Sequence, residues 1–324
     1  MREPDRGGRV APAPVQAEVA FYCDGLRLAA TVHRPAGPRP ASGWPAVVVC
    51  NGFGASRELV VPEIADRIAD AGMLALRFDY RGFGESEGRP HHLIPQEQVA
   101  DARAAVTYLE SRDDVDPGAI GLYGTSFGGG HVIALAGTDP RVRAVVSVVP
   151  VGDGSRWMRS LRRNWEWNAF RRRLREDRMR RIRTGESEWV DSDDIMIPDP
   201  HADAWHQEVI AQFPERKYSL PLETADRLLE YSPQAVVAHI APRPLLLIHV
   251  LDDDLVPTDE SEQLYAAAGE PKRLVLLPGT HHHDIYAGEP FEAVMSEAVP
   301  WLAGALGSRS HGTAAGADIR VDGG

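Results

Sequence analysis

Ser126 is the side chain in this sequence whose surroundings most strongly suggest chemistry. It lies at the centre of a Gly-x-Ser-x-Gly pentapeptide, residues 124–128. Apolar residues precede the pentapeptide at 119–123, as in a buried strand, and small and apolar residues follow at 129–137, as in a helix. A tight turn between strand and helix holds a serine hydroxyl exposed, and glycine on either side leaves room for that turn. The pattern therefore predicts a nucleophilic serine, whereas the alternative is a serine that only caps the helix.

Two loops further along the chain contain the residue types that would activate such a serine. A serine hydroxyl needs a base to remove its proton, and a histidine oriented by a carboxylate serves this purpose. Three adjacent aspartates follow an apolar run at 244–250, and three adjacent histidines follow another at 273–277. The candidate acids are Asp252, Asp253 and Asp254, and the candidate bases are His281, His282 and His283. The order serine, acid, histidine is the one expected after a strand–turn–helix nucleophile.

Asp153 is a rival for the acid. It follows the apolar run at 142–149, so it would also lie at the end of a strand. The triad is defined by geometry and not by position in the chain, so this alternative stays open at this point. Gly-Asp-Gly at 152–154 is, however, typical of a turn, and a turn residue is the better interpretation.

Metal binding is a second interpretation of the same residue types. The histidine run at 281–283 has suitable ligands, but adjacent loop residues rarely direct three imidazoles at one ion. A second set of ligand types, flanked by prolines that predict an extended surface loop, consists of Asp199, His201 and Asp203. The same geometric argument applies to that set. We therefore expect no metal and no cofactor.

The elements that must position these residues are apolar strands alternating with helices. The predicted strands lie at 17–23, 26–34, 45–50, 73–78, 119–123, 142–149, 244–250 and 273–277. The predicted helices lie at 58–71, 96–110, 129–137, 263–268 and 290–306. Strands that are apolar throughout and alternate with helices form mostly parallel sheets covered on both faces. The sequence therefore predicts an α/β fold with a doubly wound sheet, formed by residues 17–151 and 231–307.

The regular alternation breaks between residues 152 and 230. Five of the seven tryptophans lie in this segment, and its part from 156 to 183 holds twelve arginines against three acids. An insertion after a sheet strand lies above the carboxyl ends of the strands, where open α/β sheets bind their ligands. We therefore predict that residues 152–230 form a mainly helical cap. Residues 1–16 and 308–324 are predicted to be disordered tails.

The arginine-rich part of the insertion, 156–183, admits three interpretations. The first is a solvated helix that pairs with the acidic remainder of the chain or with a second subunit of a homodimer. The second is a binding site for a carboxylate or phosphate on the substrate, because arginine forks fit such groups. The third is nucleic-acid binding, which the net charge of −12 opposes. We expect a small-molecule acyl substrate and no nucleic acid, and leave open whether that substrate is anionic.

Composition favours a cytoplasmic enzyme without a membrane anchor. No run approaches the roughly eighteen apolar residues that span a bilayer. Residues 1–14 lack the apolar core of a secretory signal. The two cysteines, Cys23 and Cys50, are too few for a disulfide framework or a cysteine metal site.

Three loops together resemble the α/β-hydrolase superfamily, and within it the dienelactone-hydrolase-like serine esterases with a cap. Residues 249–257 resemble the acid loop H-G-x-x-D-x-x-V-P, with Val250 in place of glycine, and this frame selects Asp253. Residues 278–286 resemble the histidine loop P-G-x-x-H-F-D-x-Y and select His282. The match extends from residue 19 to residue 306, apart from most of the insertion.

The resemblance also implies where an oxyanion would be held. Residues 51–54 read Asn-Gly-Phe-Gly and are similar to the family's H-G-x-G loop, with Asn51 in place of histidine. The backbone N–H of Phe53 is then one donor, and that of Phe127, directly after the nucleophile, is the other. The ring of Phe53 would in addition line the acyl pocket.

The residues and the resemblance together predict a serine hydrolase that cleaves a carboxylic ester of a small organic molecule through an acyl-enzyme on Ser126. An acyltransferase or a thioesterase of a biosynthetic pathway would use the same residues. A carbon–carbon bond hydrolase and a peptidase are further alternatives, because the fold does not fix the reaction. A non-catalytic binding module is the alternative outside enzymes.

Overall fold

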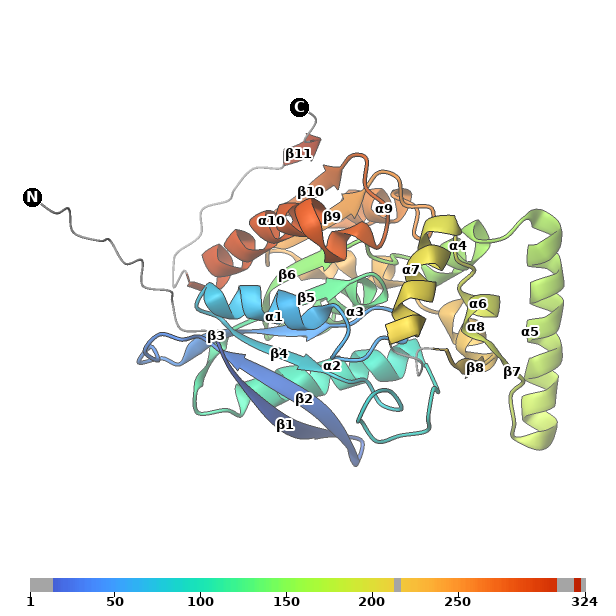
Figure 1. The fold of residues 1–324 in the computed structure, drawn as a ribbon, viewed down its shortest axis with the longest axis horizontal. Helices are drawn as coiled ribbons and strands as arrows, with labels where there is room; N and C mark the ends of the chain where they lie inside the picture. The colour runs from blue at the N-terminus through green and yellow to red at the C-terminus, as the bar shows by residue number, and fades with distance from the viewer. Residues whose placement is uncertain (1–13, 213–216, 308–317, 322–324) are drawn as a thin grey trace, which may run out of the picture.

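Nine strands of the described residues form one mostly parallel sheet at the centre of the molecule (Figure 1). The computed structural model describes residues 14–212, 217–307 and 318–321. The strands are β1 (Val15–Cys23), β2 (Leu26–Arg34), β3 (Trp44–Cys50), β4 (Leu74–Phe78), β5 (Val115–Thr125), β6 (Val142–Val148), β9 (Leu245–Val250), β10 (Lys272–Leu277) and β11 (Asp318–Val321). Their order across the sheet is β1-β2-β4-β3-β5-β6-β9-β10-β11. β2 pairs antiparallel with β1 and β4, and the other neighbours are parallel.

Helices cover both faces of this sheet. They are α1 (Val61–Asp70), α2 (Pro95–Glu110), α3 (Phe127–Ala136), α9 (Asp259–Ala267) and α10 (Gly288–Gly307). On β3, Val48 packs in the layer that contains α2 and α3, whereas Val47 and Val49 pack in the layer that contains α1 and α10. Because successive side chains of a strand point to opposite faces, a strand buried on both faces must be apolar throughout. The predicted α/β fold with a mostly parallel sheet is confirmed.

The segment from 152 to 230 consists of helices of 4 to 21 residues and a small two-stranded antiparallel sheet. Its elements are α4 (Gly154–Ser160), α5 (Asn164–Thr184), β7 (Trp189–Asp191), α6 (Ser192–Ile195), α7 (Pro200–Gln212), β8 (Ser219–Pro221) and α8 (Glu223–Leu228). Trp157 on α4 is buried, and its indole N–H donates to the carbonyl of Leu255 at 2.9 Å. The insertion is thereby tied to the loop that follows β9.

Helix α7 begins where an extended surface loop is predicted, and that prediction is wrong. Asp199 is the reason, because its Oδ1 accepts hydrogen bonds from the backbone N–H groups of His201 and Ala202 at 2.8 and 3.0 Å. Pro200 is the first helical residue, where a missing N–H leaves no bond unmade. The Asp-Pro pair therefore starts a helix here.

The arginines of α5 form ion pairs with acidic residues of the insertion. Arg173 pairs with Glu188 at 2.7 Å, and Arg178 pairs with Asp226. Arg181 bonds to Asp226 at 2.6 Å and to the buried Asp177 at 2.9 Å. α5 stands at the outer edge of the molecule in Figure 1. Five further arginines of this helix are exposed: Arg171, Arg172, Arg175, Arg180 and Arg183.

Two short segments of the predicted tails have regular structure. Val15 and Gln16 belong to β1, which pairs with β2. Asp318–Val321 forms β11 and pairs in parallel with β10. Both segments differ from the prediction, and the remainder of each predicted tail lies outside the described residues. No helix in the described part of the chain has both the length and the apolar character needed to cross a bilayer.

Candidate active site

Ser126 occupies a sharp turn between β5 and α3. Its backbone has φ 56° and ψ −122°, a conformation that residues other than glycine rarely adopt. Its N–H donates to the carbonyl of Val148 at 2.8 Å. A Cβ on Gly124 would lie 2.2 Å from the carbonyl oxygen of Gly128. A Cβ on Gly128 would lie 2.3 Å from that of Asn51. The turn is therefore closed to larger residues at both glycine positions.

The loops after β9 and β10 bring one aspartate and one histidine to this serine. His282 Nε2 lies 3.0 Å from Ser126 Oγ, and His282 Nδ1 lies 2.7 Å from Asp253 Oδ2. All three side chains are largely buried, with exposed fractions of 8% for Ser126, 6% for Asp253 and 3% for His282. A serine, an imidazole and a carboxylate thus form one continuous chain of hydrogen bonds.

The other candidates for acid and base have different surroundings. Asp252 and Asp254 are exposed beside the buried Asp253. Asp153 caps α4, where its Oδ1 accepts from the backbone N–H of Arg156 at 2.9 Å. The two rival bases, His281 and His283, do not face Ser126 as His282 does. Each stacks on a ring of α7, His281 on His201 and His283 on Trp205.

Asp253 is held in its ionised form. Burial on its own would raise the pKa of this carboxyl, but the charge of His282 and the hydrogen bonds with His249 and His282 outweigh burial and hold the pKa below its usual range. The second oxygen, Oδ1, accepts the backbone N–H groups of Leu255 and Val256 at 3.1 and 2.7 Å. These bonds fix the carboxylate in the orientation that its contact with His282 requires.

His249 is a further member of this arrangement, to which the sequence patterns assign no role. It is fully buried on β9, and its Nε2 lies 2.9 Å from the carbonyl of Val256 and 3.4 Å from Asp253 Oδ2. Its Nδ1 lies 2.7 Å from the hydroxyl of Ser261. A carbonyl only accepts, so Nε2 carries the proton and Nδ1 accepts from Ser261. His249 therefore braces the loop that presents Asp253.

The two backbone amides that the sequence predicts as oxyanion donors, those of Phe53 and Phe127, each belong to a residue next to Ser126 or next to a residue that contacts it. Phe127 is the first residue of α3, so its N–H has no acceptor within the helix. Phe53 follows Gly52, which lies against the side chain of Ser126. Within the described residues, neither amide donates a hydrogen bond. The two phenyl rings contact each other at 5.5 Å between centroids, which packs the two loops together.

A narrow pocket of about 40 Å³ surrounds Ser126 and His282. Helix α7 supplies one wall through Trp205 and His206. The Trp205 ring stacks on His283 at 4.1 Å between centroids, and the His201 ring stacks on His281 at 3.7 Å. The histidines on either side of His282 therefore anchor α7 over the serine.

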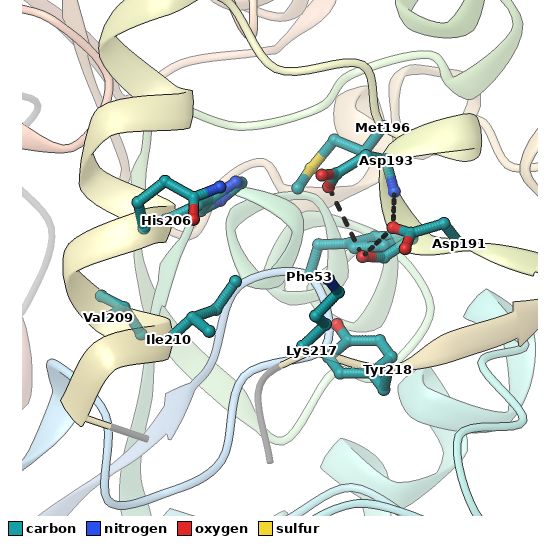
Figure 2. Close-up of a pocket in the computed structure, with 11 residues that line it drawn as sticks. Phe53, Asp191, Asp193, Met196, His206, Val209, Ile210, Lys217 and Tyr218 are labelled. Carbon is teal, nitrogen blue, oxygen red and sulfur yellow. Dashed lines mark hydrogen bonds between the residues drawn. The ribbon is translucent and has the colours of Figure 1, made fainter. Parts of the chain in front are cut away.

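A second cavity, of about 190 Å³, adjoins the serine pocket and is drawn in Figure 2. Phe53, Met196 and His206 line both. The charged groups in this cavity are Asp191, Asp193 and Lys217, and among the described residues no arginine of segment 156–183 lines either cavity. The interpretation of these arginines as a binding site for an anionic group of the substrate receives no support from the lining. In the described ranges, no three metal-ligand side chains are grouped to hold an ion.

Comparison with known proteins identifies the family. Residues 24–283 match the model of the X-Pro dipeptidyl-peptidase family (S15). The chain belongs to this family and so to the α/β-hydrolase superfamily. The predicted resemblance to α/β-hydrolases is thus confirmed, and the protein is a hydrolase of that type.

Two curated relatives and one solved structure cover nearly the whole hydrolase. The thiohydrolase aneE of Aspergillus aculeatus is 29% identical over 322 residues, 90% of this chain and 94% of the relative. The polyketide transferase claH of Penicillium crustosum is 28% identical over 302 residues, 89% of this chain and 96% of the relative. The α/β-hydrolase GrgF of Penicillium sp. sh18 superimposes with a TM-score of 0.75 at 24% identity and covers 91% of this chain and 100% of its own. This last likeness concerns the fold alone.

Proposed function

We propose that the protein is a serine hydrolase that cleaves a carboxylic ester or thioester of a small organic molecule through an acyl-enzyme on Ser126. The observation that carries the proposal is the hydrogen-bond chain from Ser126 through His282 to Asp253, with distances of 3.0 and 2.7 Å, beside a cavity. The names of two relatives, a thiohydrolase and a polyketide transferase, support acyl chemistry.

Acylation begins when His282 Nε2 takes the proton of Ser126 Oγ and the oxygen attacks the carbonyl carbon. The imidazolium that forms is stabilised by the ionised Asp253, and the backbone N–H groups of Phe53 and Phe127 stabilise the oxyanion. Collapse of the tetrahedral intermediate breaks the bond to the leaving group. His282 gives its proton to the departing alcohol or thiol, and the acyl group stays on Ser126.

Deacylation repeats these steps with another nucleophile. His282 removes a proton from a water molecule that attacks the acyl-enzyme, and the proton then returns to Ser126 as the carboxylic acid leaves. An alcohol, amine or thiol in place of water gives acyl transfer. The relative named as a polyketide transferase keeps this second outcome as an alternative, whereas the relative named as a thiohydrolase supports hydrolysis.

Hydrolysis rates for a panel of esters, thioesters and anilides test the reaction class. We expect hydrolysis of p-nitrophenyl acyl esters and of acyl thioesters of N-acetylcysteamine, and none of X-Pro p-nitroanilides, the substrates that the family name suggests. Ser126→Ala should lower turnover by a factor on the order of 10⁴ or more. Product analysis with added alcohols and amines separates hydrolysis from transfer. Turnover that Ser126→Ala leaves intact would refute the acyl-enzyme.

A further inference from the structure

The cavity next to the serine pocket has apolar and charged lining residues, the charged ones being Asp191, Asp193 and Lys217. Phe53 and Met196 line it where it meets the serine pocket, and Val209 and Ile210 line it along α7. Figure 2 shows Ile210 projecting from α7 toward the space beside Phe53. Its volume of about 190 Å³ exceeds the ~150 Å³ of an apolar cavity that binds benzene. A ring-sized group therefore fits.

The direction of proton transfer assigns this cavity to one side of the scissile bond. His282 must reach the leaving group in order to protonate it, so the leaving group lies on the side of the serine where His282 is. His282 and His283 line the serine pocket, but neither lines the larger cavity. Phe53, whose amide is proposed to bind the oxyanion, lines both. The larger cavity thus lies on the acyl side of the carbonyl.

Tyr218 marks the far end of the cavity. It lines this cavity and also a separate one of about 520 Å³, to which Phe83 and His91 contribute. The Tyr218 ring lies 4.9 Å from the ring of His91 and 6.0 Å from that of Phe83. A Cβ on Gly54 would be only 1.5 Å from the Tyr218 hydroxyl oxygen, so the tyrosine lies directly against the backbone of Gly54. The tyrosine is wedged between two loops and separates the cavities.

We propose that the 190 Å³ cavity is the acyl-binding subsite and that Tyr218 limits its length. The inference rests on the proposed function and names its substrate class. The subsite accepts a ring-sized or short-chain acyl group, of roughly six to eight non-hydrogen atoms by comparison with the benzene-binding cavity. Longer acyl chains are excluded because the Tyr218 ring blocks the way into the second cavity.

The test measures kcat/KM for p-nitrophenyl esters whose acyl chains run from acetyl to dodecanoyl. Tyr218→Ala joins the two cavities, so the ratio of dodecanoyl to hexanoyl kcat/KM should rise by about tenfold or more, as for pocket contacts with several methylenes. Tyr218→Phe is the matched control, because it keeps the ring and should keep the wild-type profile. A parallel series of butanoyl esters with different alcohols should be unaffected by either change.

A second variant makes the same cavity smaller instead of larger. Ile210→Trp fills the space beside Phe53, so kcat/KM should fall by about tenfold for hexanoyl esters and stay near wild type for acetyl esters. This variant keeps the proposal testable if Tyr218→Ala does not fold. An acyl profile that neither variant alters would overturn the assignment, as would a change confined to the alcohol series.

A binding measurement separates this inference from the proposed function. Calorimetry on Ser126→Ala with neutral N-methyl amides of the same acids reports on the cavity without any turnover. Binding that is strongest near hexanoyl and shifts to longer chains in Ser126→Ala/Tyr218→Ala supports the subsite, even if the wild type hydrolyses no ester. Turnover of esters together with chain-independent binding of the amides would refute the subsite and leave the proposed function standing.

Discussion

The geometry at the residue scale depends on Asp253, which contacts four different partners. One oxygen faces His282 at 2.7 Å and His249 at 3.4 Å, and the other accepts two backbone N–H groups. No other aspartate of the loop has such contacts, because Asp252 and Asp254 are exposed. The imidazole of His282 is thereby fixed in the tautomer that leaves Nε2 as the acceptor for the proton of Ser126.

Asp253→Asn should lower kcat for ester hydrolysis by about 10³–10⁴, because an amide favours the wrong tautomer of His282 and cannot stabilise its charged form. KM should change little, since Asp253 does not line either cavity. Steady-state kinetics on one short-chain ester measure both values. Asp252→Asn is the matched control and should behave as the wild type does. Equal losses in the two variants would argue against the role of Asp253.

The same variant has a defined effect on stability at acidic pH. The pKa of Asp253 is depressed in the folded state, so its contribution to stability is complete above the pKa of about 3.9 in the unfolded chain and is lost as the pH falls through the lower folded value. The difference in unfolding free energy between wild type and Asp253→Asn should therefore be constant from pH 7 to about pH 5 and narrow below about pH 4. Urea titrations at several pH values provide this difference. A difference that widens on acidification would contradict the depressed pKa.

At the scale of elements, α7 is the helix that decides access to the serine. It begins at an aspartate cap, packs through stacked rings on the histidine loop, and lines both cavities. These contacts give a physical reason for two histidines that a comparison of motifs leaves without a role. His281 and His283 bind the insertion to the sheet, and His282 between them turns toward Ser126.

Trp205→Ala should loosen α7 and widen the leaving-group side of the site. Loss of the stack on His283 and of partial burial should reduce the unfolding free energy by about 1–3 kcal/mol. Bulky alcohol leaving groups should be accepted better relative to methanol. Trp165→Ala is the control, because that side chain is 66% exposed on α5 and should change stability by less than about 0.5 kcal/mol. Indistinguishable unfolding curves for the two variants would show that α7 is not anchored by this stack.

At the scale of the whole molecule, the insertion carries its own balance of charges. Arg181 is central to it, since it bonds to Asp177 on its own helix and to Glu223 and Asp226 on α8. Burial alone would raise the pKa of Asp226, but Arg178 and Arg181 outweigh burial and lower it. Part of the basic character of α5 is thus neutralised within the insertion, and Arg171, Arg172, Arg175, Arg180 and Arg183 remain exposed.

Arg181→Gln should destabilise the folded protein by about 3 kcal/mol, because the fully buried carboxylate of Asp177 loses its cation. Arg183→Gln removes the same charge from an exposed site on the same helix and should cost less than about 0.5 kcal/mol. Thermal and urea unfolding compare the two variants. If the Arg181→Gln and Arg183→Gln variants are equally stable, the ion pairs of Arg181 do not hold the insertion together.

The sequence predicts those parts of this molecule that depend on local physics. Continuous apolar runs identify strands buried on both faces, and the glycines beside Ser126 identify a turn that excludes side chains. The choice of Asp253 and His282 among their neighbours comes from the resemblance to α/β-hydrolases, and the structure brings these two residues to the serine. The grouping of His249 with Asp253 is less evident, because a buried histidine four residues before an aspartate is more often only part of the core.

The contents of the insertion could not be predicted, for physical reasons. Asp199 and Pro200 are compatible with a loop or with a helix start, and only the structure shows that the Asp199 side chain caps a helix. The position of Tyr218 between two cavities could not be predicted, because it depends on its contacts with Gly54 and His91, which are distant in the sequence. Strand β11 is formed by its pairing with β10, and the local sequence of residues 318–321 does not predict that pairing.

Covalent labelling with a fluorophosphonate, followed by intact mass and peptide mapping, tests the central claim most directly. The account predicts a single adduct on Ser126, absent in Ser126→Ala and slowed by a factor on the order of 10³ or more in His282→Ala, with no comparable effect of His281→Ala. An adduct on another residue, or labelling of Ser126 at an undiminished rate without His282, would contradict the claim that His282 activates this serine.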